Sequence, residues 1–60
     1  MLIVKSVEQL RNEGYSFDSY DESLIAEALS NNLVVYLNNR KQLIAKNDDT
    51  GEEKLLMLFA

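Results

Sequence analysis

Carboxylates are the side chains best able to do chemistry in this chain, because ten Asp and Glu are present and His is absent. Without histidine, no hydroxyl has the usual general base beside it, which excludes familiar triad-type nucleophilic catalysis. Oxygen ligands for Ca²⁺ or Mg²⁺ stand at Asp18, Asp21, Glu22, Asp48 and Asp49. Their spacing is not that of an EF-hand loop, and Cys is also absent, so we expect no bound metal ion.

One tripeptide is found where two carboxylates can work together. Asp49-Thr50-Gly51 matches the core of aspartic protease active sites, in which two aspartates share a proton. The same tripeptide is typical of a hairpin turn, and the acids Asp48 and Glu52 beside it suit a solvated loop. A chain of 60 residues also lacks the strands needed to build a substrate cleft. We interpret the tripeptide as a turn and predict a protein that is not an enzyme and binds no cofactor.

A small cluster of basic and aromatic residues raises the question of nucleic-acid binding. Arg40, Lys41 and Lys46 stand near Tyr36 in a segment that could act as the wing of a nucleic-acid reader. The net charge of −4 and the pI near 4.5 argue against this function, because nucleic-acid affinity depends on neutralising phosphates. We predict no direct contact with nucleic acid.

Composition restricts the class of protein further. Apolar residues make up 47% of the chain, which is the fraction of a globular protein. No apolar run approaches the ~20 residues that a membrane span needs, and residues 1–4 are too short for a signal-peptide core. We expect a single domain over residues 1–60, soluble and cytoplasmic, with no membrane partner. A domain this small buries only ~60% of its unfolded surface, so association is the expected source of extra stability.

Two helix starts are indicated by side chains that can cap free backbone N–H groups. Ser6 precedes Gln9 by three residues, which predicts a short helix that ends at Gly14 and follows a strand over residues 1–5. Ser19 precedes Glu22 by the same spacing, which predicts a second helix over about 20–30. The apolar stripe of this helix consists of Leu24, Ile25, Ala28 and Leu29.

After residue 32 the pattern changes to short apolar runs separated by turn residues. The predicted strands cover residues 33–37, 42–46 and 53–59, joined by loops at 38–41 and 48–51. The fold class is then α+β, with two short helices packed on one face of a three- to four-stranded, mainly antiparallel β-meander. Two alternatives stay open. The first strand could pair beside 33–37 or beside 53–59, and residues 52–58 could instead form a helix.

Both faces of the predicted meander are apolar. The loops place Val35 opposite Ile44 and Ile44 opposite Leu55, and directly opposed residues point to the same side. One face then carries Leu33, Val35, Leu37, Ile44, Leu55, Met57 and Phe59. The other carries Val34, Tyr36, Leu43, Ala45, Leu56, Leu58 and Ala60. Two short helices can cover one face, so the second face is left for a partner.

The predicted function is that of a small, non-catalytic protein-interaction or regulatory module. It would form a homodimer, or bind another protein, through an interface made of Val34, Tyr36, Leu43, Leu56 and Leu58. An alternative is an acidic decoy or inhibitor that occupies the site of a nucleic-acid-binding protein, because residues 8–27 carry six acids and one base. Its possible contact face consists of Asp21, Glu22 and Glu27.

Overall fold

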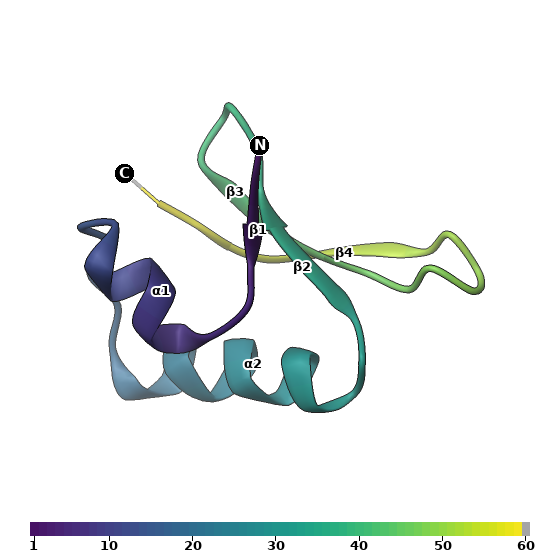
Figure 1. Cartoon of the computed structure of the whole chain (residues 1–60), viewed down its shortest axis with the longest axis horizontal. Coiled ribbons are helices and arrows are strands. Elements are labelled where there is room, and N and C mark those ends of the chain that lie inside the picture. Colours follow the sequence, from purple (N-terminus) through teal and green to yellow (C-terminus); the bar gives the residue numbers. More distant parts are fainter. Residues whose placement is uncertain (60) are drawn as a thin grey trace.

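The computed structural model describes residues 1–59, which form two helices and a four-stranded antiparallel sheet (Figure 1). The elements are β1 (Leu2–Val4), α1 (Val7–Asn12), α2 (Ser19–Ser30), β2 (Val34–Leu37), β3 (Gln42–Lys46) and β4 (Glu53–Leu58). The strand order across the sheet is β1-β2-β3-β4, so β1 pairs beside β2 and the last three strands form a meander. The predicted α+β class is confirmed, and the alternative of a C-terminal helix is wrong.

The start of α1 is fixed by the predicted pair of polar side chains. The Ser6 hydroxyl accepts a hydrogen bond from the backbone N–H of Gln9 at 3.2 Å. The Gln9 amide reaches back in turn, because its Oε1 accepts from the N–H of Lys5 at 2.6 Å and its Nε2 donates to the carbonyl of Ile3 at 3.0 Å. These bonds join α1 to the end of β1.

The cap of α2 lies one residue earlier than predicted. Asp18, and not Ser19, accepts from the backbone N–H of Asp21, at 2.9 Å. An aspartate at this position supplies the same oxygen as a serine and adds a negative charge at the positive end of the helix dipole. The helix ends as predicted, with Asn32 in the left-handed region at a φ of 62°.

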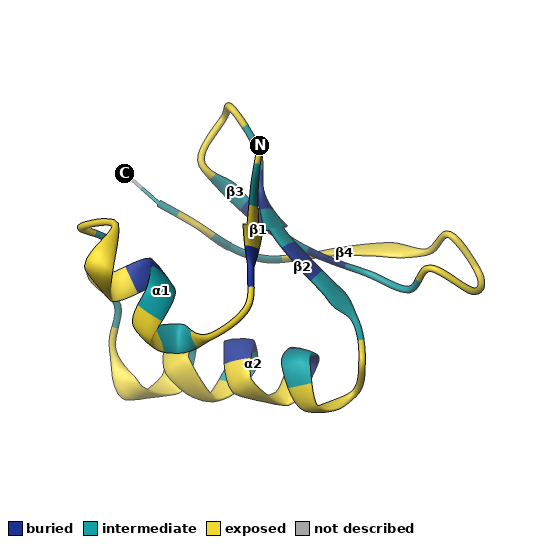
Figure 2. Cartoon of the chain, viewed as in Figure 1, coloured by how far each residue is buried: buried dark blue, intermediate teal, exposed yellow. Residues whose placement is uncertain are grey.

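The helices and the sheet enclose one hydrophobic core. Its fully buried members are Val4, Leu10, Ile25, Ala28, Val35, Leu37, Leu43 and Ala45. The strand residues of this set alternate along β2 and β3, so they occupy a single face of the sheet. Both helices lie on that side of the sheet, with their buried positions turned toward it (Figure 2).

The register between β2 and β3 differs from the prediction by one residue. Val35 pairs with Ala45 and not with Ile44. The reason lies in the loop, where the N–H of Asn38 donates to the carbonyl of Gln42 at 3.1 Å and the Asn38 Oδ1 accepts from the N–H of Gln42 at 3.0 Å. These bonds extend the ladder by one pair, which leaves a three-residue loop in place of the predicted four.

This shift changes the side of the sheet to which β3 residues point, because side chains alternate along a strand. Leu43, predicted to lie in the partner interface, is a core residue with 0% exposure. Ile44, predicted to face the core, lies on the opposite side with Tyr36, its partner in the ladder. Ala60, which the prediction assigned to the second face, lies outside the described residues.

A β-bulge in β4 shows that a second residue of the predicted interface, Leu56, was assigned to the wrong side of the sheet. Leu43 pairs with Met57, whereas Ile44 pairs with Leu55 as predicted, so Leu56 is an extra residue between the two pairs. Leu56 and Met57 both pack against the core. Leu56 therefore does not belong to the surface that a partner could contact across the open side of the sheet.

The loop between β2 and β3 contains a strained residue that gives a test of this register. Lys41 has a φ of 60°, the left-handed region in which a Cβ atom is unfavourable. We expect Lys41→Gly to raise the free energy of unfolding by about 0.5–1 kcal/mol, since glycine relieves the strain but gains freedom in the unfolded chain. Thermal unfolding should show a midpoint a few degrees higher. Arg40→Gly is the control and should lower the midpoint; a lower midpoint for Lys41→Gly would contradict this loop geometry.

The end of β4 packs against the segment between the helices. The Phe59 ring lies 4.8 Å from the Tyr15 ring and 6.2 Å from the Phe17 ring, measured between centroids. The guanidinium of Arg11 stacks 4.3 Å above Phe17 and forms an ion pair with Glu22 at 2.6 Å. These contacts join the last strand to both helices.

Candidate interaction surface

A row of four side chains crosses the sheet on the side opposite the helices. Ile3 pairs with Tyr36, Tyr36 with Ile44, and Ile44 with Leu55. Directly paired residues of an antiparallel sheet point to the same side, so these four form a continuous line over all four strands. We call Ile3, Tyr36, Ile44 and Leu55 the apolar row.

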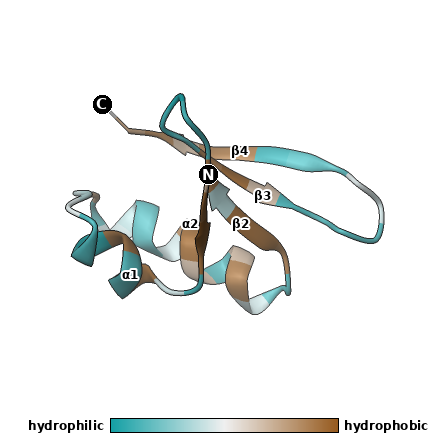
Figure 3. Ribbon diagram, turned by 45° about the horizontal axis from the view of Figure 1, so that its top comes forward, coloured by the Kyte–Doolittle hydropathy of each residue, from teal (hydrophilic) through white to brown (hydrophobic). Residues whose placement is uncertain are grey.

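Two further apolar side chains flank the row and complete what we call the open face. Val34 lies on one side of the row, beside Lys46 and Glu53, and Leu58 lies on the other side, beside Gln42. Leu55 and Leu58 are 52% and 66% exposed, and Ile3 is 37% exposed. Val34, Tyr36 and Ile44 are half-buried. Figure 3 shows brown, hydrophobic stretches along the strands of the sheet.

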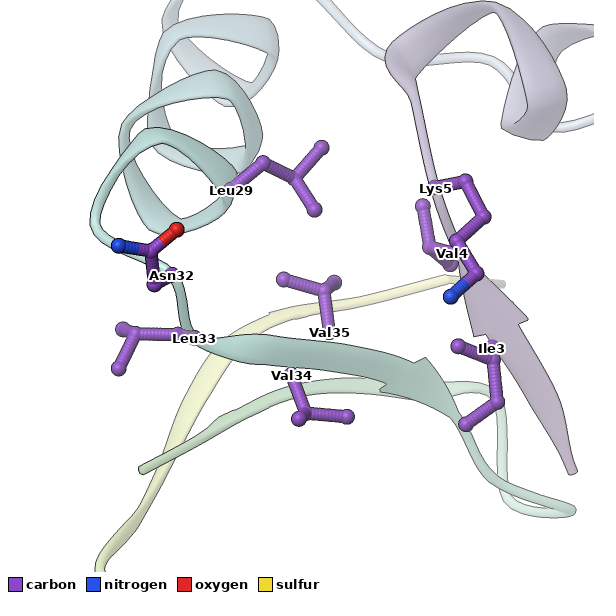
Figure 4. A pocket seen from close by; sticks show the side chains of 8 residues that line it. All are labelled: Ile3, Val4, Lys5, Leu29, Asn32, Leu33, Val34 and Val35. Carbon is purple, nitrogen blue, oxygen red and sulfur yellow. The ribbon is translucent and has the colours of Figure 1, made fainter. Parts of the chain in front are cut away.

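The two sides of β2 show how the surface arises. In Figure 4, Val35 points toward Leu29 of α2, whereas the neighbouring Val34 points away from the helix. One hollow of about 260 Å³ lies between α2 and β1, where Leu29 and Val35 line it. A second hollow of about 230 Å³ is lined by Ile3, Val34 and Tyr36 of the open face.

Tyr36 presents its ring to solvent and directs its hydroxyl to a group within the chain. The hydroxyl donates a hydrogen bond to Oε2 of Glu53 at 2.7 Å, which spans from β2 across β3 to β4. This bond, then partial burial and the negative charge of Glu53, raise the pKa of Tyr36 above its ordinary value of 10.0. Because the hydroxyl already has a partner, the ring can pack against apolar surface without leaving a polar group unpaired.

The raised pKa of Tyr36 predicts a specific pH dependence. The stabilisation from this hydroxyl is complete below pH 10 and is lost as the pH rises through the raised pKa, because ionisation breaks the bond to Glu53. We expect Glu53→Ala to move the pKa of Tyr36 back toward 10.0. Titration of the Tyr36 ring carbon by NMR measures this shift. Glu52→Ala removes a neighbouring carboxylate that is not the acceptor and should leave the pKa nearly unchanged; equal effects of the two variants would contradict the assignment.

The three acids of the alternative contact face do not share one side of α2. At 3.6 residues per turn, Asp21, Glu22 and Glu27 point in three different directions around the helix. The Glu22 carboxylate is paired with Arg11, which partly neutralises it. Asp21 is half-buried, and Glu27 is exposed. These acids therefore form no common contact surface.

The tripeptide Asp49-Thr50-Gly51 forms the end of a hairpin. The Oδ1 of Asn47 accepts from the N–H of Asp49 at 2.9 Å and from that of Thr50 at 3.3 Å. Gly51 has a φ of 79° and donates its N–H to the carbonyl of Asn47 at 2.7 Å. This geometry agrees with our interpretation of a turn. Residues 1–59 contain no group of three or more acidic side chains arranged to hold a metal ion.

The predicted partner interface is thus divided by the structure. Val34, Tyr36 and Leu58 lie on the open face, whereas Leu43 and Leu56 contribute to the core. The prediction missed three members of the surface, which are Ile3, Ile44 and Leu55. A signal for Ile44 was available in the sequence, because Asn38 at the start of the turn favours a three-residue loop closed by its own side chain.

Comparison with known proteins finds no relative, since no family model, no curated protein and no solved structure matches the chain. Within residues 1–59, neither helix has the length and apolar character required to cross a membrane. The fold and the open face therefore define the class. This is a small α+β protein with an apolar sheet face on the side away from its helices.

Proposed function

We propose that this protein is a small, non-catalytic interaction module that binds another protein chain through the open face. The observation that carries the proposal is the apolar row, which crosses four strands on the side of the sheet opposite the core. Its end members Ile3 and Leu55 are the most exposed of the four, so the row extends to both edges of the sheet.

Leaving this apolar surface in water is unfavourable. Burial of apolar surface contributes about 25 cal/mol per Å², and a contiguous apolar patch is typical of protein-binding sites on small proteins. Tyr36 strengthens the case, because tyrosine is enriched at interfaces and its hydroxyl is already bonded to Glu53. The core of a chain of 60 residues is small, so binding of a partner to the open face would also add to its stability.

Site-specific photo-crosslinking tests the proposal in cells that carry the protein. A benzophenone amino acid replaces Leu55 on the open face in one variant and Tyr20 on α2 in the control. Tyr20 is 71% exposed, so both positions are exposed apolar sites that tolerate a large side chain. We expect a protein adduct from position 55 and little from position 20. Equal adduct yields from the two positions, or none from position 55, would refute a binding role for the open face.

The decoy alternative receives no specific support from the geometry. It needs several carboxylates on one surface to imitate a nucleic acid, and Asp21, Glu22 and Glu27 diverge around α2. Its motivation remains the acidic composition of residues 8–27.

A further inference from the structure

We propose that the partner is a second copy of this chain, and that the two open faces stack with their strands antiparallel and with a two-fold axis along the apolar row. This inference rests on the proposed function, since it names the occupant of the same surface. It also assigns the orientation of the two copies, which the apolar surface by itself does not determine.

The charges at the two ends of β3 give the orientation. The loop before β3 carries Arg40 and Lys41, and the loop after it carries Asp48 and Asp49; all four are exposed. Ile44 stands four residues after Arg40 and four residues before Asp48. The centre of the apolar row is therefore also the midpoint between a basic end and an acidic end of the sheet.

A two-fold axis along the row makes these ends complementary. Each residue of β3 then lies over the residue at the same distance on the other side of Ile44 in the second copy, because the strands run in opposite directions. Arg40 of each copy meets Asp48 of the other, and this contact occurs twice. Lys46 of each copy meets the neutral Gln42 of the other. The four side chains of the row meet the same four side chains, which buries the apolar surface of both copies.

The other two-fold arrangement of stacked faces has its axis parallel to the strands. It would place β3 of each copy over β2 of the other, with the basic loops at the same end and the acidic loops at the same end. Like charges brought together at an interface are unfavourable, so this arrangement opposes association at both ends of the sheet. The charge pattern of the chain thus selects the antiparallel stack.

Stacking of faces is favoured over pairing of strand edges. The outer strand β4 contains the bulge at Leu56 and carries the exposed Lys54, and both features discourage edge-to-edge pairing. The other outer strand, β1, has three residues. Stable interfaces bury about 800 Å² on each partner, which is about a fifth of the 4221 Å² surface of this chain. The edge of β4 is six residues, or ~20 Å, long and one strand wide, so it offers less surface for burial than a face that spans all four strands.

Charge exchange between two variants tests the orientation. Variant one carries Arg40→Glu and Lys41→Glu, and variant two carries Asp48→Lys and Asp49→Lys. In the antiparallel stack each variant alone brings like charges together at both ends, so we expect its dimer dissociation constant to rise about tenfold. In a mixture of the two variants every end contact becomes attractive again. Sedimentation equilibrium should then show a mixed dimer with an affinity close to that of the original protein.

Two further variants separate stacking of faces from pairing of edges. Ile3 lies on β1, far from the edge of β4. Ile3→Asp should raise the dissociation constant of a stacked dimer about a hundredfold and leave a dimer paired through the β4 edge intact. Tyr20→Asp on α2 is the control and should leave the affinity unchanged. Circular dichroism confirms that each variant is folded before its mass is measured.

The outcomes distinguish this inference from the proposed function. A dimer that the mixture restores and that Ile3→Asp dissociates supports the antiparallel stack. A dimer that the mixture does not restore, or that Ile3→Asp leaves intact, overturns it. A chain that sediments at 6.9 kDa at 100 µM also overturns it. In that case crosslinks from position 55 to a different protein would still support the interaction module, whereas the absence of any adduct would remove both.

Discussion

Replacing Leu43 with alanine should lower the free energy of unfolding by about 3 kcal/mol, a large part of the total stability of so small a domain. Leu43 has 0% exposure and is surrounded by the core, so truncation leaves a cavity that the rigid sheet cannot fill. Ile44→Ala, at the next position, should cost about 1 kcal/mol or less, because Ile44 is half-buried on the open face. The two substitutions remove similar side chains from adjacent residues and differ in the face they affect.

Urea denaturation at one low protein concentration measures both values and limits the contribution of association. The pair of variants tests the register directly. A register shifted by one residue would put Ile44 in the core and Leu43 outside, and it would reverse the order of the two effects. A larger loss for Ile44→Ala than for Leu43→Ala would contradict the structure described above.

Replacing Phe59 with alanine is expected to have the second largest effect, a loss of about 2 kcal/mol. The Phe59 ring contacts the rings of Tyr15 and Phe17, and its N–H donates to the carbonyl of Lys41 at 2.9 Å. Truncation removes the ring contacts and keeps the backbone bond. We expect the end of β4 to separate from the segment between the helices.

Leu58→Ala is the matched control for this prediction. Leu58 is adjacent to Phe59 but is 66% exposed on the open face, so its truncation should change the free energy of unfolding by less than about 0.5 kcal/mol. Thermal unfolding measures both variants, and hydrogen exchange of the β4 amides should accelerate in Phe59→Ala. Equal stabilities of the two variants would show that Phe59 does not join β4 to the helices.

The sequence was sufficient to predict those features that depend on local chemistry. The cap at Ser6, the end of α2 near residue 30 and the turn at Gly51 all follow from side chains that act within a few residues of their own position. The boundaries of β3 were also correct, because turn residues limit the strand on both sides. Local signals of this kind determine where elements begin and end.

The register between β2 and β3 was predicted wrongly, although the side chain of Asn38 at the turn carried a local signal for it. A loop of three or four residues at 38–41 gives strands of the same length, yet the choice decides whether Leu43 or Ile44 enters the core. The apolar residues on both sides of β3 removed the alternation that normally identifies the buried face. The bulge at Leu56 adds a second shift that no single strand pattern reveals.

The register error changed the predicted membership of the candidate surface on β3 and left that on β2 unchanged. Val34 and Tyr36 of β2 lie on the side of the sheet to which the prediction assigned them, because that assignment used alternation within one strand. Leu43 was wrong because it was assigned by pairing with a neighbouring strand. The expectation that one sheet face lacks helical cover did not depend on the register, since either pairing leaves apolar side chains on both faces.

The most direct test of a second copy on the open face is an isotope-filtered NOE experiment on a mixture of ¹³C-labelled and unlabelled chains. We predict intermolecular contacts from the methyl groups of Ile44 to those of Ile44 in the other chain, and from Leu55 to Leu55, because the axis along the apolar row places each member over its own counterpart. Intermolecular contacts confined to the backbone edge of β4, or found only from side chains of α2, would contradict the account.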